Sequence, residues 1–153
     1  MTFVPIIDFV TSAKKEGARV AMEVGLTDAN DLFRNEYWLA QVGYRKDRNF
    51  LIFECEQDRG YGVDVRFGVG GKEEKGRSFH TFLRLYDSPA AYALGRCLPK
   101  DQSDMNDLLR LYAEALLKHR KEVFERTEKT ITSMDRDLGE KNPPFNPTGR
   151  FCR

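Results

Sequence analysis

Residues 36–69 read EYWLAQVGYRKDRNFLIFECEQDRGYGVDVRFGV and contain three runs in which apolar side chains recur at every second position. The recurring positions are Trp38, Ala40 and Val42 in the first run, Leu51, Phe53 and Cys55 in the second, and Val63, Val65, Phe67 and Val69 in the third. This period of two indicates half-buried strands, because successive side chains leave a pleated sheet on opposite faces. The polar segments 45–49 and 57–62 between the runs are rich in residues that favour hairpin turns. The stretch therefore predicts an antiparallel β-meander.

Helical patterns flank the meander. A short helix is expected from about Ile6 to a position before Gly17, and residues 18–24 fit either a strand or another helical turn. Apolar residues at three- and four-residue spacing predict the longest helix over about 103–133. The expected fold class is therefore α+β, an antiparallel β-meander of three to four strands packed against an N-terminal helix and a long C-terminal helix.

The segment between the meander and the long helix is less clearly patterned. Residues 79–86, FHTFLRLY, alternate like a candidate fourth strand, and strand and helix both remain open for them. The sequence Asp-Ser-Pro that follows predicts a short helix with Ser88 as its N-cap and Gly95 as its end. The long helix is expected to begin at Ser103 or Asp101 as its cap.

Length and composition indicate one well-solvated domain. With 153 residues, we expect a single α+β domain over 1–138 and a proline-rich C-terminal tail over 139–153. The 25 basic and 24 acidic residues leave a net charge of +1, so a nucleic-acid partner is not expected. Three cysteines without ligand-like spacing favour reduced thiols and predict no cofactor. No basic leader and no apolar run of roughly 18–20 residues is present, which predicts a cytoplasmic protein without a membrane segment.

Carboxylates gather on the predicted meander and support two interpretations. The charged residues of the polar register and of the second hairpin turn are Glu54, Glu56, Asp58, Arg59, Asp64 and Arg66. Carboxylates on neighbouring strands can bind a divalent metal for phosphodiester hydrolysis. However, Asp64-Val65-Arg66 has arginine at the position where restriction-type nuclease motifs have lysine. The same residues also fit a ladder of cross-strand ion pairs on a solvated sheet face.

Other candidate motifs are weaker. Residues 68–72, GVGGK, lack the Ser or Thr that follows the lysine of a phosphate-binding loop, which favours a flexible hairpin loop. His80 and His119 lie on different expected elements, and His119 belongs to a basic cluster that fits a solvated helix turn. Cys97 and a histidine would suffice for nucleophilic catalysis, but no spacing brings them together.

Aromatic residues are concentrated in the meander. Trp38 is expected in the core, whereas Tyr37, Tyr44 and Tyr61 lie near strand ends or turns and are expected at the surface beside the carboxylates. Tyrosine, tryptophan and arginine are the side chains that protein interfaces favour. Ordinary packing of the sheet is the alternative interpretation.

The run from Glu36 to Phe67 resembles a pattern in small bacterial α+β proteins of the toxin-immunity type. The resemblance rests on Tyr37-Trp38, Glu54, Asp58-Arg59 and Asp64 to Arg66, and it covers about a fifth of the chain. It implies a cytoplasmic protein that neutralises a partner by surface complementarity and has no catalysis of its own.

The sequence thus leads to two hypotheses from different classes, and a third concerns assembly. The first is a non-catalytic protein-binding domain, in its narrower form an immunity protein, whose expected partner-binding residues are Tyr37, Tyr44, Glu54, Glu56, Asp58, Arg59, Tyr61, Asp64 and Arg66. Its partner would be a protein such as a toxin domain, which it would inhibit by occlusion. The alternative is a metal-dependent hydrolase or nuclease that uses the same carboxylates. In the third, a homodimer forms along the edge of the meander.

Overall fold

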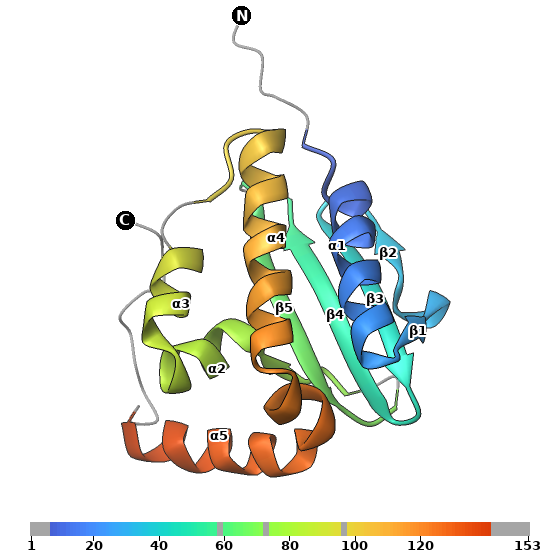
Figure 1. Ribbon diagram of the computed structural model, residues 1–153. Coiled ribbons are helices and arrows are strands. Elements are labelled where there is room, and N and C mark those ends of the chain that lie inside the picture. The colour runs from blue at the N-terminus through green and yellow to red at the C-terminus, as the bar shows by residue number, and fades with distance from the viewer. Residues whose placement is uncertain (1–6, 58–59, 72–73, 96–97, 142–153) are drawn as a thin grey trace, which may run out of the picture.

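The computed structural model describes residues 7–57, 60–71, 74–95 and 98–141, and it confirms the α+β class (Figure 1). In chain order the elements are α1 (Phe9–Val24), β1 (Thr27–Asp28), η1 (Asn30–Leu32), β2 (Arg34–Asn35), β3 (Leu39–Lys46), β4 (Asn49–Glu56), β5 (Gly62–Val69), β6 (Arg77–Ser78), α2 (Phe79–Tyr86), α3 (Ser88–Leu94), α4 (Gln102–Lys118), η2 (Lys121–Glu125) and α5 (Thr127–Lys141). The first three residues of the predicted tail belong to α5, and the rest of that tail lies outside the described residues.

The predicted meander is the centre of the sheet. β3, β4 and β5 are antiparallel neighbours, and Ala40, Cys55 and Val63 lie beside one another across them. Short strands complete the sheet, because β1 and β2 both pair with the outer edge of β3 and β6 pairs with Arg66 and Phe67 of β5. The strand order is therefore β1-β3-β4-β5-β6, with β2 beside β1 on the same edge.

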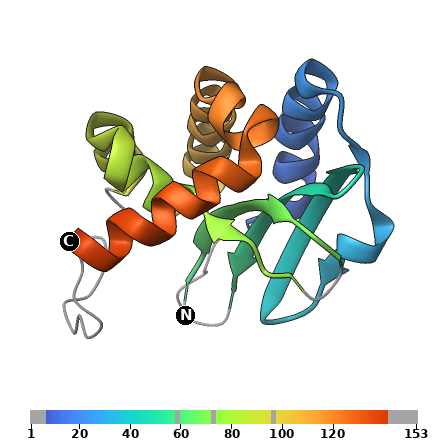
Figure 2. The same cartoon turned by 90° about the horizontal axis from the view of Figure 1, so that it is seen from below.

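The helices α1, α3 and α4 lie on one side of the sheet, and Figure 2 shows them above it in the view from below. The side chains of the sheet that face this helical layer are buried: Ala40, Val42, Tyr44, Leu51, Phe53, Cys55, Val65 and Phe67. On the opposite face, a small second core forms where Ala29 and Leu32 cover Phe50 and Ile52. The alternation of the sequence thus separates two faces of unequal apolar content, as expected for an antiparallel sheet.

α1 is longer than predicted, because it continues through Gly17 and ends only at Val24. Gly17 does not break the helix, because its missing side chain leaves room for the Tyr44 ring to pack against this point of α1. The helix is ended by Gly25, which adopts the left-handed conformation with a φ of 79° that glycine tolerates best. Residues 18–24 are therefore helical.

Residues 79–86 form α2, so the expectation of a fourth strand there is wrong. Ser78 caps the helix, since its Oγ accepts a hydrogen bond from the Thr81 amide at 3.3 Å. The buried residues follow the helical period: Phe79, Phe82 and Leu83. An apolar run this short fits both periods, and the serine cap favours the helical one.

The single long helix predicted over 103–133 is also wrong, because the chain turns at η2 into a second helix. η2 is a π-helical turn, and Figure 1 shows α5 running crosswise below the end of α4. Two hydroxyls stabilise the turn by donating to backbone carbonyls. Thr127 Oγ1 lies 2.7 Å from the Val123 oxygen, and Thr130 Oγ1 lies 2.6 Å from the Glu122 oxygen.

Both α3 and α4 begin with an aspartate cap. Asp101, one of the two predicted candidates, caps α4 by accepting from the amide three residues further on. α3 is capped by Asp87 and not by the predicted Ser88, because the Asp87 carboxylate accepts from the Ala90 amide at 3.4 Å. α3 ends before Gly95, as predicted.

Candidate functional site

The strongest candidate site is a cleft along the edge of β5, with a volume of about 490 Å³. Its lining residues are Glu54 and Glu56 of β4, Gly62, Val63, Asp64 and Arg66 of β5, Ser78 of β6, His80, Thr81 and Arg84 of α2, Leu94, Gly95, Leu98 and Pro99 at and after the end of α3, and Leu108 and Tyr112 of α4. We call this feature the β5 cleft. It extends from the helical layer to the opposite side of the sheet, which we call the open face.

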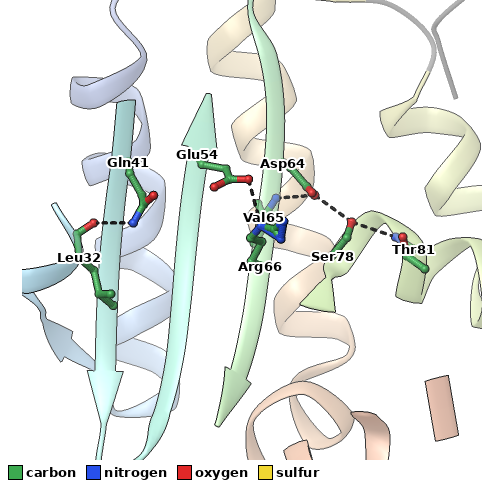
Figure 3. Close-up of polar contacts among 8 residues, drawn as sticks. All are labelled: Leu32, Gln41, Glu54, Asp64, Val65, Arg66, Ser78 and Thr81. Atoms are coloured by element: carbon green, nitrogen blue, oxygen red, sulfur yellow. Dashed lines mark hydrogen bonds and ion pairs between the residues drawn. The ribbon is translucent and has the colours of Figure 1, made fainter. Parts of the chain in front are cut away.

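The structure brings the predicted charged residues of β4 and β5 together. Glu54 lies directly opposite Asp64 across the two strands, and Arg66 Nε donates to Glu54 Oε1 at 3.0 Å (Figure 3). Asp64 Oδ1 accepts from Ser78 Oγ at 3.0 Å and from the Val65 amide at 2.8 Å. One cross-strand ion pair of the predicted ladder is therefore present, between Arg66 and Glu54, whereas Asp64 is bound by Ser78 at the start of α2 and by the Val65 amide.

Burial governs the electrostatics of these two carboxyl groups. The pKa of Asp64 is raised mainly by burial, although Ser78, the Val65 amide and Arg66 favour its charged form. The pKa of Glu54 is also raised, chiefly by burial, and Arg66 opposes this shift. The protein thus retains two partly desolvated carboxylates where neutral side chains would be easier to bury.

The segment β1-η1-β2 covers one part of the open face and leaves the other part uncovered. The side-chain Nε2 of Gln41 in β3 donates a hydrogen bond to the Leu32 carbonyl at 3.0 Å, which holds η1 over the β3 side (Figure 3). The Arg45 guanidinium forms an ion pair with Asp31 Oδ2 of the same segment at 3.0 Å. The β5 side carries no such cover among the residues that the structure describes, and there the β5 cleft opens.

The predicted aromatic residues are arranged differently from the expectation. The prediction that Tyr44 lies at the surface is wrong, because Tyr44 shares the register of Val42 and is 2% exposed in the core. The prediction that Trp38 lies in the core is also wrong, because Trp38 precedes β3 and is 49% exposed. Tyr37 is 88% exposed, as expected. Tyr61 is only half-buried against the core, and its hydroxyl accepts from the Ile7 amide at 3.5 Å.

Of the other predicted partner-binding residues, Glu56 is exposed at the end of β4, and Asp58 and Arg59 lie outside the described residues, as does the candidate nucleophile Cys97. Of the expected partner-binding residues, the structure brings Glu54, Glu56, Asp64 and Arg66 together on the open face, whereas Tyr37 precedes β3. Within the described ranges, no group of three or more His, Cys, Asp or Glu side chains is placed to hold a metal ion.

The two histidines occupy packed positions that sequence reasoning did not find. His80 lines the β5 cleft, and its Nε2 lies 3.1 Å from the Ala91 carbonyl oxygen. His119 is not on a solvated turn, since its side chain is 16% exposed and its Nε2 lies 2.7 Å from Asp87 Oδ2. Ser78 was also missed, and its signal is a serine followed by apolar residues at helical spacing.

No protein-family model matches the chain, and searches of curated proteins and of solved structures found no significant match. Separately, none of the helices in the described part of the chain is long and apolar enough to cross a bilayer.

Proposed function

We propose that this chain is a protein-binding domain without catalysis of its own, which presents to a protein partner the end of its sheet where β3 begins and β4 ends, together with the β5 side of its open face. The observation that carries this proposal is the exposure of two adjacent aromatic residues, Tyr37 at 88% and Trp38 at 49%, beside the carboxylates of the sheet. Large aromatic side chains of this kind are the anchors of protein interfaces, because their burial removes much apolar area from water.

The backbone holds these two residues in place next to the acidic end of β4. The Gln57 amide donates to the Trp38 carbonyl at 2.9 Å, and Leu39 lies opposite Glu56 in the ladder. The Arg34 guanidinium lies 5.1 Å from the centre of the Trp38 ring, which limits the freedom of the indole. A partner would therefore meet a Trp38 ring that is already restrained, so little of its conformational entropy would be lost on binding.

The charge of this surface indicates the chemistry of the partner. Glu56 is exposed and forms no ion pair with the described residues, and Glu54 and Asp64 lie behind it in the β5 cleft. A basic protein surface would be attracted by these carboxylates, and the aromatic pair would slow its release. Occlusion of a basic toxin active site is the narrower form of this proposal. It draws on the resemblance to immunity proteins.

The test is a quantitative capture from a lysate of the cells that encode the chain. The wild-type protein is compared with a variant of the proposed surface, Tyr37→Ala/Trp38→Ala/Glu56→Lys. The matched control, Met22→Ala/Leu111→Ala, removes apolar side chains that are also exposed, at 85% and 37%, but lie on the helical layer. We expect one stoichiometric protein whose recovery falls by about tenfold or more with the surface variant only.

Two results would contradict the proposal. Equal recovery by the surface variant and the wild type would remove the open face from the interface. A loss confined to the control variant would move the interface to the helices.

A further inference from the structure

We infer that the β5 cleft receives an extended segment of the partner, which adds to the sheet as a strand beside β5 and alternates basic with apolar side chains. This inference rests on the proposed function, because it names the chemistry that the same surface would recognise. Strand addition to a sheet edge is a recurrent mode of peptide recognition, in which main-chain hydrogen bonds supply affinity and alternate side chains supply specificity.

The first observation is that β5 has an incomplete edge. β5 spans Gly62–Val69, but β6 pairs with it only at Arg66 and Phe67. Beyond that point the chain leaves the sheet at Ser78 and enters α2. In the described part of the chain, residues 62–65 are paired with β4 alone, and the β5 cleft lies on their other side.

The direction of the backbone groups follows from one hydrogen bond. The Val65 amide donates to the Asp64 carboxylate at 2.8 Å, so this amide points away from β4. In an antiparallel ladder, every second residue directs both its N–H and its C=O to the same side. Val63 therefore directs its amide and its carbonyl toward the cleft together with the Val65 carbonyl, and these are the groups that an added strand would bind.

The walls of the cleft differ in chemistry on the two sides of such a strand. Toward the helical layer they are apolar, with Leu94 and Leu98 from the α3 end and Leu108 from α4. Toward the open face they carry the carboxylates of Glu54, Glu56 and Asp64, of which Glu54 is paired with Arg66. Arg84 of α2 also lines the cleft, so three carboxylates face two guanidinium groups. Because successive side chains of a strand point to opposite faces, the matching segment has apolar residues on one face and basic residues on the other.

The dimensions suit a short segment. Four residues of strand extend about 13 Å at roughly 3.3 Å per residue. The cleft volume of about 490 Å³ also lies within the roughly 300–1,000 Å³ of ordinary ligand sites. A segment of about four residues would thus continue the line of β6 along the remaining edge of β5.

The probe for the test is a capped, fluorescein-labelled hexapeptide of alternating valine and lysine, titrated into the full chain and followed by fluorescence anisotropy. We expect saturable binding, which weakens about tenfold or more when glutamate replaces the lysines. N-methylation of alternate peptide amides should abolish binding, because it removes the main-chain donors. At saturation, amide hydrogen exchange should slow at Val63, as measured by NMR.

Two matched variants locate the probe. Leu98→Asp alters an exposed wall residue, at 51%, and should weaken peptide binding about tenfold. Leu111→Asp changes a leucine that is 37% exposed on α4, outside the cleft, and should leave binding unchanged. Absence of peptide binding, equal binding by Leu98→Asp, or an unchanged Val63 amide would each overturn the inference. If the inference failed but lysate capture still depended on Tyr37 and Trp38, the proposed protein-binding function would stand. If capture did not depend on Tyr37 and Trp38, the proposed function itself would be refuted.

Discussion

Asp87 and His119 are separated by 32 positions in the sequence, yet Asp87 Oδ2 lies 2.7 Å from His119 Nε2. The same oxygen accepts from Lys118 Nζ at 3.0 Å, and the His119 ring packs edge-on against Phe82 with centroids 5.2 Å apart. Since Asp87 also caps α3, one carboxylate joins the α2-α3 junction to the end of α4. The junction connects α2 to α3, and residues of α2 and of the end of α3 line the β5 cleft, so the stability of the junction bears on the proposed site.

Replacing this carboxylate should have a pH-dependent cost. The hydrogen bonds from His119 and Lys118 lower the pKa of Asp87 from 3.8 to about 2. A lowered pKa means that the charged form stabilises the fold above about pH 4, and this stabilisation is lost as the pH falls toward 2. Because Lys118 is largely exposed, we expect Asp87→Asn to reduce the free energy of unfolding by about 1–2 kcal/mol at pH 7, with the difference shrinking in acid.

Urea unfolding of the wild type and the variant between pH 7 and pH 3 measures this effect. The control is Asp101→Asn, because Asp101 is also an N-cap aspartate. Asparagine can accept the capping hydrogen bond in both variants, so only the Asp87 variant also loses ion pairs. That control should change the free energy of unfolding by less than about 0.5 kcal/mol. An equal effect of the two substitutions would show that the ion pairs of Asp87 contribute nothing.

Asp64 should behave in the opposite way. Burial raises its pKa above 3.8, so its protonated form is favoured by folding. The stabilisation is full below about pH 4 and is lost as the pH rises through the raised pKa. Asp64→Asn keeps an acceptor for Ser78 and removes the buried charge, so we expect the free energy of unfolding at pH 7 to rise by up to about 1 kcal/mol.

The measurement is chemical unfolding at pH 7 and pH 4, with the exposed Glu56→Gln as the control. The increase in the free energy of unfolding that Asp64→Asn causes should be smaller at pH 4 than at pH 7. A loss of stability that is the same at both pH values would indicate that the Asp64 charge is compensated in the fold. A gain in stability joined to weaker binding of the alternating peptide would show that the charge is kept for recognition.

Gly43 should be sensitive to any side chain. A Cβ atom at this position would collide with the Leu32 side chain of η1, which covers the open face at this strand. We expect Gly43→Ala to destabilise the fold by about 1–3 kcal/mol, as overpacking does. Gly62→Ala in β5 is the control, because no atom lies within 4 Å of the point that its Cβ would occupy and its φ is ordinary. Thermal unfolding compares the two, and equal melting temperatures would show that η1 is not packed on Gly43.

The bend between α4 and α5 should depend on the Thr130 hydroxyl, one of the two that donate to backbone carbonyls of the turn. Thr130 is 8% exposed and reaches across the π-helical turn to the Glu122 carbonyl. We expect Thr130→Val to lower the free energy of unfolding by about 1 kcal/mol. Thr132→Val removes a hydrogen bond to Glu128 within exposed α5 and should have little effect. If the two variants unfold at the same urea concentration, the hydroxyl of Thr130 does not stabilise the turn.

Local alternation was sufficient to predict the three central strands β3, β4 and β5, but not the two-residue strands β1, β2 and β6. The register that places Leu51, Phe53 and Cys55 together on one face was correct, because all three belong to the main core under the helices. The same rule, applied to Tyr44, would have placed it in the core with Val42. The expectation that Tyr44 is exposed came from its position near the end of the strand, which here continues to Lys46.

Two features depended on contacts that are distant in the sequence. The continuity of α1 through Gly17 depends on the Tyr44 ring from β3, and the position of His119 depends on Asp87. No spacing rule relates such pairs, because they meet only after the helices pack on the sheet. The bend at η2 lacks a proline or glycine signal, so the apolar stripe alone favoured one helix.

Hydrogen–deuterium exchange of the captured complex tests the central claim most directly. If the open face binds the partner, exchange slows upon complex formation in peptides that cover residues 36–41, 52–57 and 62–66, and it is unchanged over the exposed surfaces of α1 and α4. Protection confined to α1 and α4, with unchanged exchange in those three segments, would contradict the account.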